Sequence, residues 1–295
     1  MPLTTSWLPQ YLRGVGLLDV GEPVAIEAKA GRRATFAVSR NEDVYYVKQF
    51  GPSSHDYQHW ANEAGSLEQA SAPTLVHADG VLRVLVTLAA GRPLVEHLAD
   101  KAHAVVLAAL LADTLDTLSH NPLSVDGERL KIFTLLAGTS AEAPPVLVRV
   151  RRLPGITACL RQCLDEWDRG PQTLLHGDLK LWHTFLDSDG TMRLTDWESS
   201  LRGHRFWDLG LVCASAFSRW VSTHDAGGEA ELVFARAVLS RTGPSLLPWV
   251  VLGSLQLAYE GSPEIEISHK SGQLAQFAVN LASDCARAYE EFKLS

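Results

Sequence analysis

The residues whose types and spacing suit catalysis are concentrated in one stretch, Leu174–Trp197. It contains Asp178, then His183 five residues later, and Asp196 near its end. Between them, the Asp-Gly turn signal of Ser188–Thr191 separates two short runs rich in aliphatic, aromatic and β-branched residues. This pattern predicts a β-hairpin, and counting outward from the turn puts His183 opposite Asp196. The hairpin would bring two carboxylates and an imidazole to one rim. A surface hairpin with solvated carboxylates has the same pattern.

Three short motifs occur in a fixed order in and after this stretch. They are His-Gly-Asp-Leu-Lys at 176–180, Thr-Asp-Trp-Glu at 195–198 and Gly-His-Arg-Phe-Trp-Asp-Leu-Gly at 203–210. Together they resemble the signature of the aminoglycoside phosphotransferase and choline kinase family, the small-molecule relatives of the protein kinases. Three motifs at compatible spacings are far more specific than one.

The resemblance implies a fold class and a reaction. The fold is expected to be α+β and bilobal, as in protein kinases, with a β-rich N-lobe and a mostly helical C-lobe. The expected cofactors are ATP and Mg²⁺. At the matching positions, Asp178 orients the acceptor hydroxyl and takes its proton, and Asp196 holds Mg²⁺ at the phosphates. Lys180 lies near the γ-phosphate or is merely a solvated lysine. His176 and Asp208 are expected to brace the backbone of the catalytic loop.

The chain departs from the family pattern at His183, where the family has a metal-binding Asn. Mg²⁺ prefers oxygen ligands, whereas imidazole suits Zn, Cu, Fe and Ni. His183 is a candidate metal ligand on this resemblance, and three interpretations stay open. It coordinates weakly, it hydrogen-bonds a phosphate, or it marks a protein that has lost catalysis.

The elements that must position these residues begin with three strand-like runs, at 23–27, 34–38 and 44–48. Their β-branched and aromatic content predicts the start of an antiparallel sheet, and a short helix is expected around 7–12. The turn at 30–33 should cover the nucleotide phosphates. It holds a single glycine, Gly31, and therefore offers few backbone amides to a phosphate. Arg32 and Arg33 supply positive charge there or are simply solvated.

Lys48 ends the third strand-like run, at the position of the family's lysine that holds the α- and β-phosphates. That lysine needs an acid on the following helix. Residues 56–69 have a helical pattern, and Glu63 is the expected partner of Lys48, with Glu68 as the second choice. A solvated helix glutamate is the alternative interpretation of Glu63.

Two more strands are predicted at 73–77 and 81–88, and the segment that follows resembles the family's hinge. Backbone groups near Leu88 and Ala90 are then expected to meet the adenine edge of ATP. We place the lobe boundary near residue 91, which gives an N-lobe of residues 1–91 and a C-lobe of residues 92–295.

The remainder of the chain is predicted to be mainly helical, because its apolar residues recur at helical spacing. The expected helices are 102–119, 156–168, 209–222, 229–240, 246–259 and 272–294. Residues 123–153 hold few clear signals, and this insertion is a candidate lining of the acceptor site.

Composition excludes several classes of function. The 295 residues carry a net charge of −8, which provides no electrostatic footprint for nucleic acid or an anionic membrane. No signal peptide and no run of about 18 apolar residues is recognised, so a cytoplasmic protein without a membrane span is expected. The four cysteines are expected to be free thiols. P-loop and dinucleotide-binding glycine motifs are absent from the sequence.

Three functions stay open. The first is an ATP-dependent phosphotransferase that moves the γ-phosphate to a hydroxyl of a small molecule, such as an aminoglycoside, a sugar or an amino alcohol. The second is a kinase-like enzyme that phosphorylates Ser or Thr of a precursor peptide in natural-product biosynthesis, with a partner lyase; Lys180 and the poor phosphate loop favour it. The third is a pseudokinase that acts as a scaffold for a partner protein, which His183 and the same loop favour. An extended groove would favour the peptide, and a small acidic pocket the small molecule.

Overall fold

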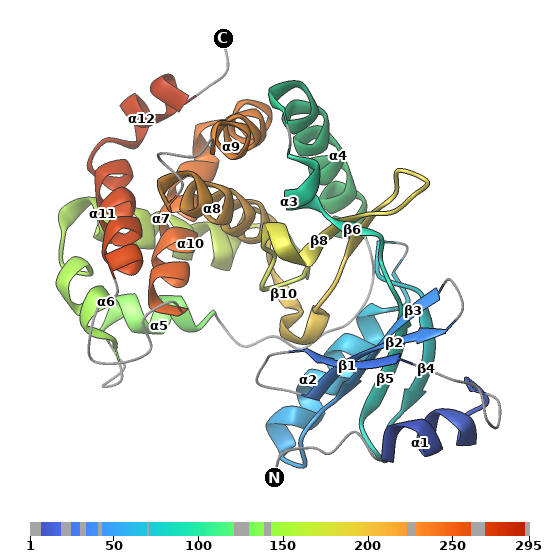
Figure 1. The fold of residues 1–295 in the computed structure, drawn as a ribbon. Helices are drawn as coiled ribbons and strands as arrows, with labels where there is room; N and C mark the ends of the chain where they lie inside the picture. The colour runs from blue at the N-terminus through green and yellow to red at the C-terminus, as the bar shows by residue number, and fades with distance from the viewer. Residues whose placement is uncertain are drawn as a thin grey trace. The chain divides into compact units, whose positions relative to one another are not determined.

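The fold is seen in a computed structural model that describes residues 7–18, 25–29, 34–40, 43–69, 71–98, 100–120, 130–138, 143–222, 228–260 and 269–292. The chain packs as two compact units. The N-terminal unit comprises Met1–Gly91 with Asp187–Ser199, and the C-terminal unit comprises Arg92–Leu186 with Ser200–Ser295. One unit is built on a sheet and the other is mainly helical (Figure 1), which confirms the predicted α+β class.

The N-terminal unit is built on a five-stranded antiparallel sheet with the strand order β1-β2-β3-β5-β4. The strands are β1 (Ala25–Lys29), β2 (Ala34–Arg40), β3 (Asp43–Gln49), β4 (Leu75–Asp79) and β5 (Val84–Leu88). The predicted short N-terminal helix is α1 (Leu8–Gly14). Leu8 and Leu12 of α1 pack in one apolar cluster with strand residues Phe36, Val38, Val47, Val84 and Val86.

The five predicted strands are all present, but the last one begins later than expected. Val81 and Leu82 lie in a turn, where both of their N–H groups donate to the Asp79 side chain at 2.9 Å. The Asp79 side chain therefore holds the backbone of Val81 and Leu82 in a turn, although their β-branched and aliphatic side chains predicted a strand.

Strand alternation decides where Lys48 points. Val47 is fully buried in the apolar cluster, so the next residue of β3 must face the other side of the sheet. There it meets α2 (Ser54–Ser66), which begins with a capping box: Ser53 Oγ accepts the Asp56 N–H, and Asp56 accepts the Ser53 N–H. This box satisfies two backbone donors of the first turn and starts the helix two residues before the predicted start.

The two units divide after Gly91, where the boundary was predicted, but Asp187–Ser199 of the predicted C-lobe belong to the N-terminal unit. Their backbone is tied to the segment before β4, because the Leu194 N–H donates to the Ser71 carbonyl at 2.6 Å. The Arg193 guanidinium donates to the Ala72 carbonyl at 3.3 Å. The predicted turn is present but one residue shorter, since the Asp187 N–H donates to the Thr191 carbonyl at 2.9 Å and the Gly190 N–H donates to the Asp187 carbonyl at 3.0 Å. Asp187 therefore pairs with Thr191, and the predicted register that put His183 opposite Asp196 is wrong by one residue.

The C-terminal unit is mainly helical. Its longer helices are α4 (Lys101–Ser119), α7 (Pro154–Arg169), α8 (Phe206–Ser222), α9 (Glu229–Thr242), α10 (Leu247–Glu260) and α11 (His269–Ser283). Shorter helices are α3 (Leu94–His97), α5 (Lys131–Ala137), α6 (Pro145–Val150) and α12 (Cys285–Phe292), and the strands are β6 (Arg92–Pro93), β7 (Gln172–Leu175), β8 (Thr184–Leu186) and β10 (Leu201–His204).

Helices α8 and α10 form the centre of this unit, and two glycines let them approach closely. A Cβ added to Gly210 of α8 would lie 2.7 Å from the Trp249 backbone, and one added to Gly253 of α10 would lie 3.1 Å from the Gly210 carbonyl oxygen. Most residues of both helices are buried. This contact fixes the position of the end of α10, where Glu260 lies.

Three features of this unit differ from the sequence prediction. The helix expected at 272–294 is two helices, and Asp284 between them accepts the Arg287 N–H, as an N-cap residue does. The 123–153 insertion contains α5 and α6, and its residues 123–129 and 139–142 lie outside the described residues. The antiparallel pair β7 and β10 was not predicted.

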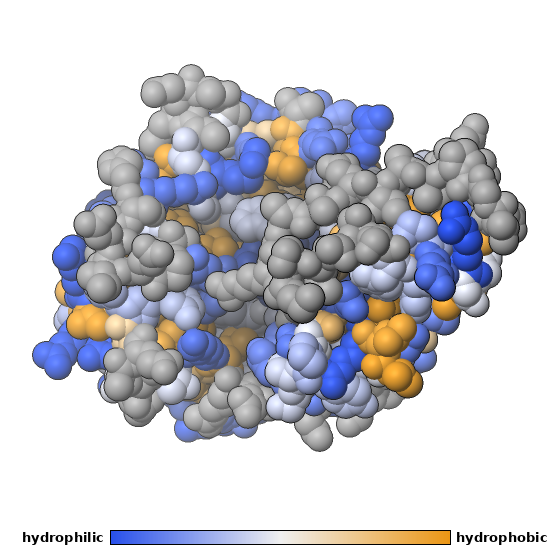
Figure 2. All heavy atoms as spheres, turned by 60° about the horizontal axis from the view of Figure 1, so that its bottom comes forward, coloured by the Kyte–Doolittle hydropathy of each residue, from blue (hydrophilic) through white to orange (hydrophobic). Residues whose placement is uncertain are grey.

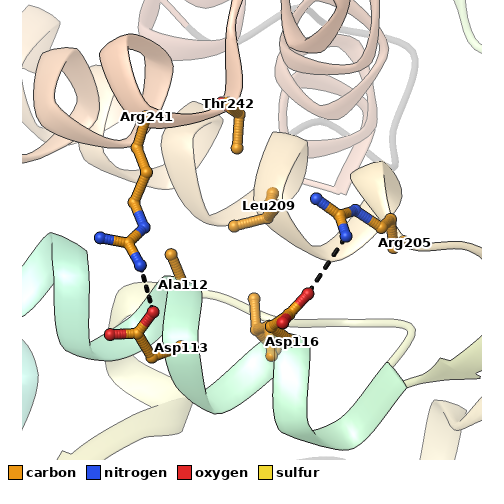
Figure 3. Close-up of a pocket in the computed structure, with 8 residues that line it drawn as sticks. Ala112, Asp113, Asp116, Arg205, Leu209, Arg241 and Thr242 are labelled. Carbon is orange, nitrogen blue, oxygen red and sulfur yellow. Dashed lines mark hydrogen bonds and ion pairs between the residues drawn. The ribbon is translucent and has the colours of Figure 1, made fainter. Parts of the chain in front are cut away.

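Helix α4 is long and apolar enough to cross a membrane by length and composition alone, a test that core helices also pass. Two of its acidic residues pair with arginines elsewhere in the same unit. Asp113 pairs with Arg241, Asp116 pairs with Arg205, and the four side chains help to line a pocket (Figure 3). These contacts indicate a helix that packs within its own unit, and the absence of a membrane span stays a prediction.

Where Figure 2 is coloured, hydrophilic residues alternate with apolar areas, and the largest apolar area lies toward the right of the view. The exposed side chains of Tyr57 and Val81 lie near the same residue, Trp60: Tyr57 stacks on its ring, and Gly80, next to Val81, packs against it. Single exposed apolar side chains such as Val106 are normal on a protein surface.

Candidate active site

In the N-terminal unit, one lysine joins two carboxylates. The Lys48 ammonium lies 2.7 Å from Glu63 Oε1 and 2.6 Å from Asp196 Oδ1. Glu63 is only 3% exposed, so its charge depends on a close cation. Burial lowers the pKa of Lys48, but the two carboxylates outweigh burial and the pKa is raised overall. The predicted pairing of Lys48 with Glu63 is therefore confirmed, and Glu68 is not needed as its substitute.

Asp196 lies in an unusual backbone conformation, with φ at 72°. This left-handed region is costly for residues other than glycine, although Asp and Asn tolerate it best, and such residues often occur at functional sites. The oxygens of Asp196, Glu63 and Glu198 lie within 4.8 Å of one another. Three hard oxygen donors suit Mg²⁺ or Mn²⁺.

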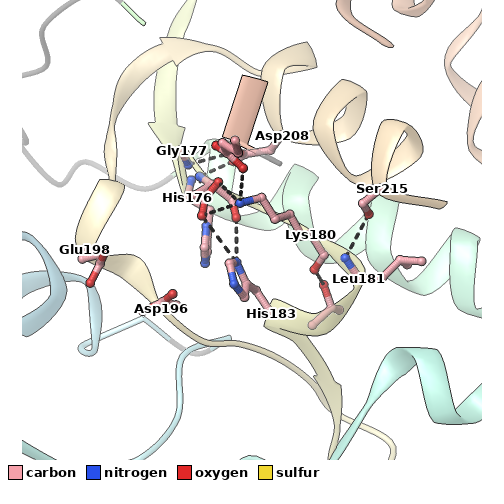
Figure 4. A network of polar contacts seen from close by, with 12 residues as sticks. His176, Gly177, Lys180, Leu181, His183, Asp196, Glu198, Asp208 and Ser215 are labelled. Atoms are coloured by element: carbon pink, nitrogen blue, oxygen red, sulfur yellow. Dashed lines mark hydrogen bonds and ion pairs between the residues drawn. The ribbon is translucent and has the colours of Figure 1, made fainter. Parts of the chain in front are cut away.

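In the C-terminal unit, Asp208 at the start of α8 holds the backbone that leads to Asp178 (Figure 4). Its two carboxylate oxygens accept the N–H groups of His176 at 2.7 Å and Gly177 at 3.0 Å. The Trp207 indole donates to the Gly177 carbonyl at 2.8 Å. The two N–H donors lower the pKa of Asp208, but burial outweighs them and the pKa is raised to about 7 overall. This clamp confirms the structural role predicted for Asp208.

Asp178 and Lys180 form a tight ion pair that a third residue completes. The Lys180 ammonium lies 2.7 and 2.9 Å from the two Asp178 oxygens and 2.9 Å from Glu260 Oε2. Lys180 is buried, so the interpretation as a solvated lysine is wrong. Burial raises the pKa of Asp178, Lys180 lowers it and Glu260 raises it, for a net rise. Burial lowers the pKa of Lys180, but the two carboxylates raise it overall.

His183 is fixed by the loop itself. Its Nδ1 lies 2.7 Å from the Asp178 carbonyl oxygen, which assigns the ring proton to Nδ1 because a carbonyl only accepts. Its ring stacks on His176 at a centroid distance of 6.0 Å. The buried His176 accepts the Asp178 N–H at 3.4 Å, so the two imidazoles shape the loop together. Among the described residues, the clusters that could hold a metal do not include His183.

The remaining predicted residues concern the nucleotide. Arg32 lies outside the described residues. Near the expected hinge, the Leu88 N–H already donates to the Thr74 carbonyl and the Ala89 N–H to the Val44 carbonyl. Adenine recognition by the Leu88 N–H would therefore break a bond of the sheet, and Ala90 stays the better candidate.

Sequence reasoning missed two acidic residues of the site. Glu198 was quoted in the Asp-Trp-Glu motif without a role, although its place two residues after Asp196 was a usable signal. Glu260 had no signal, because it lies 80 residues after Lys180 at the end of a helix.

Comparison with known proteins supports the chemistry that the geometry suggests. The family described as phosphotransferase enzyme family matches residues 25–244. No curated protein matches the sequence.

Solved structures show the same fold at low sequence identity. Choline kinase LicA from Streptococcus pneumoniae is 15% identical, with a TM-score of 0.63 over 94% of this chain and 98% of that chain. Plasmodium vivax ethanolamine kinase is 15% identical, with a TM-score of 0.62 over 99% and 91%. A ternary complex of aminoglycoside phosphotransferase APH(4)-Ia with ADP and hygromycin B is 13% identical, with a TM-score of 0.56 over 97% and 99%. The bilobal kinase-like fold is therefore confirmed.

Proposed function

The chain belongs to the phosphotransferase enzyme family, and on that premise we propose that it transfers the γ-phosphate of ATP to a hydroxyl group of a small molecule. The observation that carries the proposal is the pairing of Lys48 with Glu63 and Asp196, because phosphoryl transfer needs a positioned cation for the nucleotide phosphates. Similar solved structures contain AMP or ADP, which supports a nucleotide as the donor.

In this proposal the N-terminal unit binds the nucleotide. Lys48 binds the α- and β-phosphates, and Glu63 continues to hold the Lys48 ammonium in position. Asp196 and Glu198 would hold Mg²⁺, which neutralises phosphate charge when it is bound. The carboxylate oxygens of Asp196 and Glu198 are the hard donors that such an ion prefers.

The C-terminal unit supplies the acid–base chemistry. Asp178 accepts the proton of the acceptor hydroxyl as the hydroxyl oxygen bonds to the γ-phosphorus and the bond from that phosphorus to the β-phosphate bridging oxygen breaks. ADP leaves with the electron pair of that bond. Lys180 balances negative charge on the transferred phosphoryl group.

The acceptor is proposed to be a small molecule with a positive charge. Asp178 and Glu260 share the single ammonium of Lys180, so this cluster has a net negative charge that favours a cationic hydroxyl compound, such as an amino alcohol or an aminoglycoside. The peptide acceptor with a partner lyase and the pseudokinase stay predictions, as does the cytoplasmic location.

Calorimetric titration of ATP tests the nucleotide half of the proposal. ATP is titrated with Mg²⁺, and then with Mn²⁺, into the wild type, Asp196→Ala and the matched turn variant Asp189→Asn. We expect metal-dependent binding to the wild type and Asp189→Asn, and its loss in Asp196→Ala. If the folded wild type binds ATP with neither metal, the proposed function is wrong.

Phosphorus NMR of reactions with amino alcohols, aminoglycosides, sugars and Ser/Thr peptides tests the acceptor half. A new phosphate monoester with an amino compound is expected. A product formed only with peptides would replace the small-molecule proposal by the peptide one.

A further inference from the structure

Lys180 is a buried ammonium held by two carboxylates from different parts of the C-terminal unit. It is 7% exposed, and its contacts of 2.7, 2.9 and 2.9 Å reach both oxygens of Asp178 and one oxygen of Glu260. An amine buried to this extent keeps its charge only with such partners.

Glu260 is itself fixed in two ways. Its Oε1 accepts a hydrogen bond from the Gln256 amide at 2.6 Å, one helical turn earlier, which leaves Oε2 turned to Lys180. The backbone of α10 is held against α8 by the close approach at Gly210 and Gly253. The carboxylate of Glu260 is therefore presented by a rigid helix, which is the usual requirement for precise placement of a charged partner.

The proposed chemistry makes competing demands on this cluster. Asp178 has to accept a proton from the acceptor hydroxyl, yet both of its oxygens contact Lys180. Because the Glu260 carboxylate shares the Lys180 ammonium, Lys180 binds Asp178 less tightly. Glu260 also keeps the ammonium in the cluster when Asp178 turns an oxygen to the hydroxyl.

We propose that Glu260 is a positioning residue, which acts through Lys180 to keep the ammonium beside Asp178 while one Asp178 oxygen turns to the acceptor hydroxyl. This role rests on the proposed phosphotransferase function and adds a residue to it. Glu260 does not itself take a proton or touch the phosphate.

A mutant cycle in the full-length protein tests this role. The turnover of ATP with an acceptor found by screening is measured for wild type, Glu260→Gln, Lys180→Met and the double variant, with Glu291→Gln on the exposed face of α12 as a matched control. Glu260→Gln is expected to lower kcat about tenfold to a hundredfold, the scale of a misplaced catalytic group. The KM for ATP should stay unchanged. In the Lys180→Met background, Glu260→Gln should lower kcat much less than it does in the wild type. In the wild-type background, Glu260→Asp should retain part of the rate that Glu260→Gln loses.

Three results would overturn the role. They are an equal loss of rate in both backgrounds, a higher KM for the acceptor with kcat unchanged, and a rate for Glu260→Gln equal to that of the control. The second result would make Glu260 an acceptor-binding residue. Because the Glu260 side chain is 33% exposed, its isosteric variant is expected to fold, and Lys180→Gln, which also lacks the charge, replaces Lys180→Met if the latter does not.

Urea unfolding of the same four proteins separates failure of this role from failure of the proposed function. Stability coupling between Lys180 and Glu260 without any turnover by the wild type overturns the phosphotransferase function, and the positioning role with it, but retains the ion pair. Turnover without either stability coupling or rate coupling overturns the positioning role alone.

Discussion

Replacing Lys48 by methionine isolates the energetic effect of the buried ion pair. Met keeps most of the side-chain volume but removes the ammonium from Glu63 and Asp196. Glu63 is 3% exposed, and removing one partner of a buried ion pair costs about 3–5 kcal/mol. The Asp196 side chain is 35% exposed, and loss of a pair at such a site costs about 0–1 kcal/mol. The total destabilisation by Lys48→Met should therefore be close to the contribution of the Glu63 ion pair.

The assay is urea unfolding of the nucleotide-free protein, followed by circular dichroism. Typical domains are stable by about 5–15 kcal/mol, so Lys48→Met should still fold. The double variant Lys48→Met/Glu63→Gln should recover most of the stability.

An exposed ion pair provides the matched control. Lys101 pairs with Glu229 at 2.6 Å, but both side chains are largely exposed. Lys101→Met should therefore change stability far less than Lys48→Met does. The reasoning is refuted if Lys48→Met is as stable as Lys101→Met, or if the double variant is no more stable than Lys48→Met alone.

Two other predictions concern the clamp and the glycines. Asp208→Asn should lower the free energy of unfolding in urea by about 1–3 kcal/mol, because one of the two N–H groups that Asp208 accepts would face an amide N–H₂. The kcat should fall as well. Unchanged stability and kcat would contradict the clamp. Gly65→Ala in α2 should stabilise the protein by about 0.5–1 kcal/mol, since an added Cβ meets no atom within 4 Å. Gly155→Ala should destabilise it by about 1–3 kcal/mol, since its Cβ would lie 2.2 Å from the Ala282 carbonyl oxygen. Equal unfolding midpoints for the two alanine variants would contradict this packing.

Much of the fold and of the candidate site could be predicted because the signals were local. β-branched and aromatic content gave the five strands of the sheet, and helical spacing gave the major helices. Lys48 and Glu63 could be paired because the family resemblance implies a strand lysine with an acid on the following helix, and the chain has both in that order. The clamp of Asp208 on the catalytic loop was predicted from the resemblance of the 203–210 motif.

Local signals failed where elements were short or where a polar side chain set the backbone. Strands β7 and β10 have four residues each, too few for a clear alternation. The N-cap at Asp284 divides a run that otherwise has continuous helical spacing. Asp79 draws Val81 and Leu82 into a turn, against their preference for strands.

The sequence by itself determined the fold class, the family and the residue types of the site, because each depends on the order and spacing of residues close together in the chain. Only the tertiary structure decided that Asp187–Ser199 packs with the N-terminal unit, and that Glu260 reaches Lys180. The reason is physical. The approach of α8 to α10 at Gly210 and Gly253 places a carboxylate 80 residues away beside a buried ammonium, and no periodicity along the chain encodes that contact.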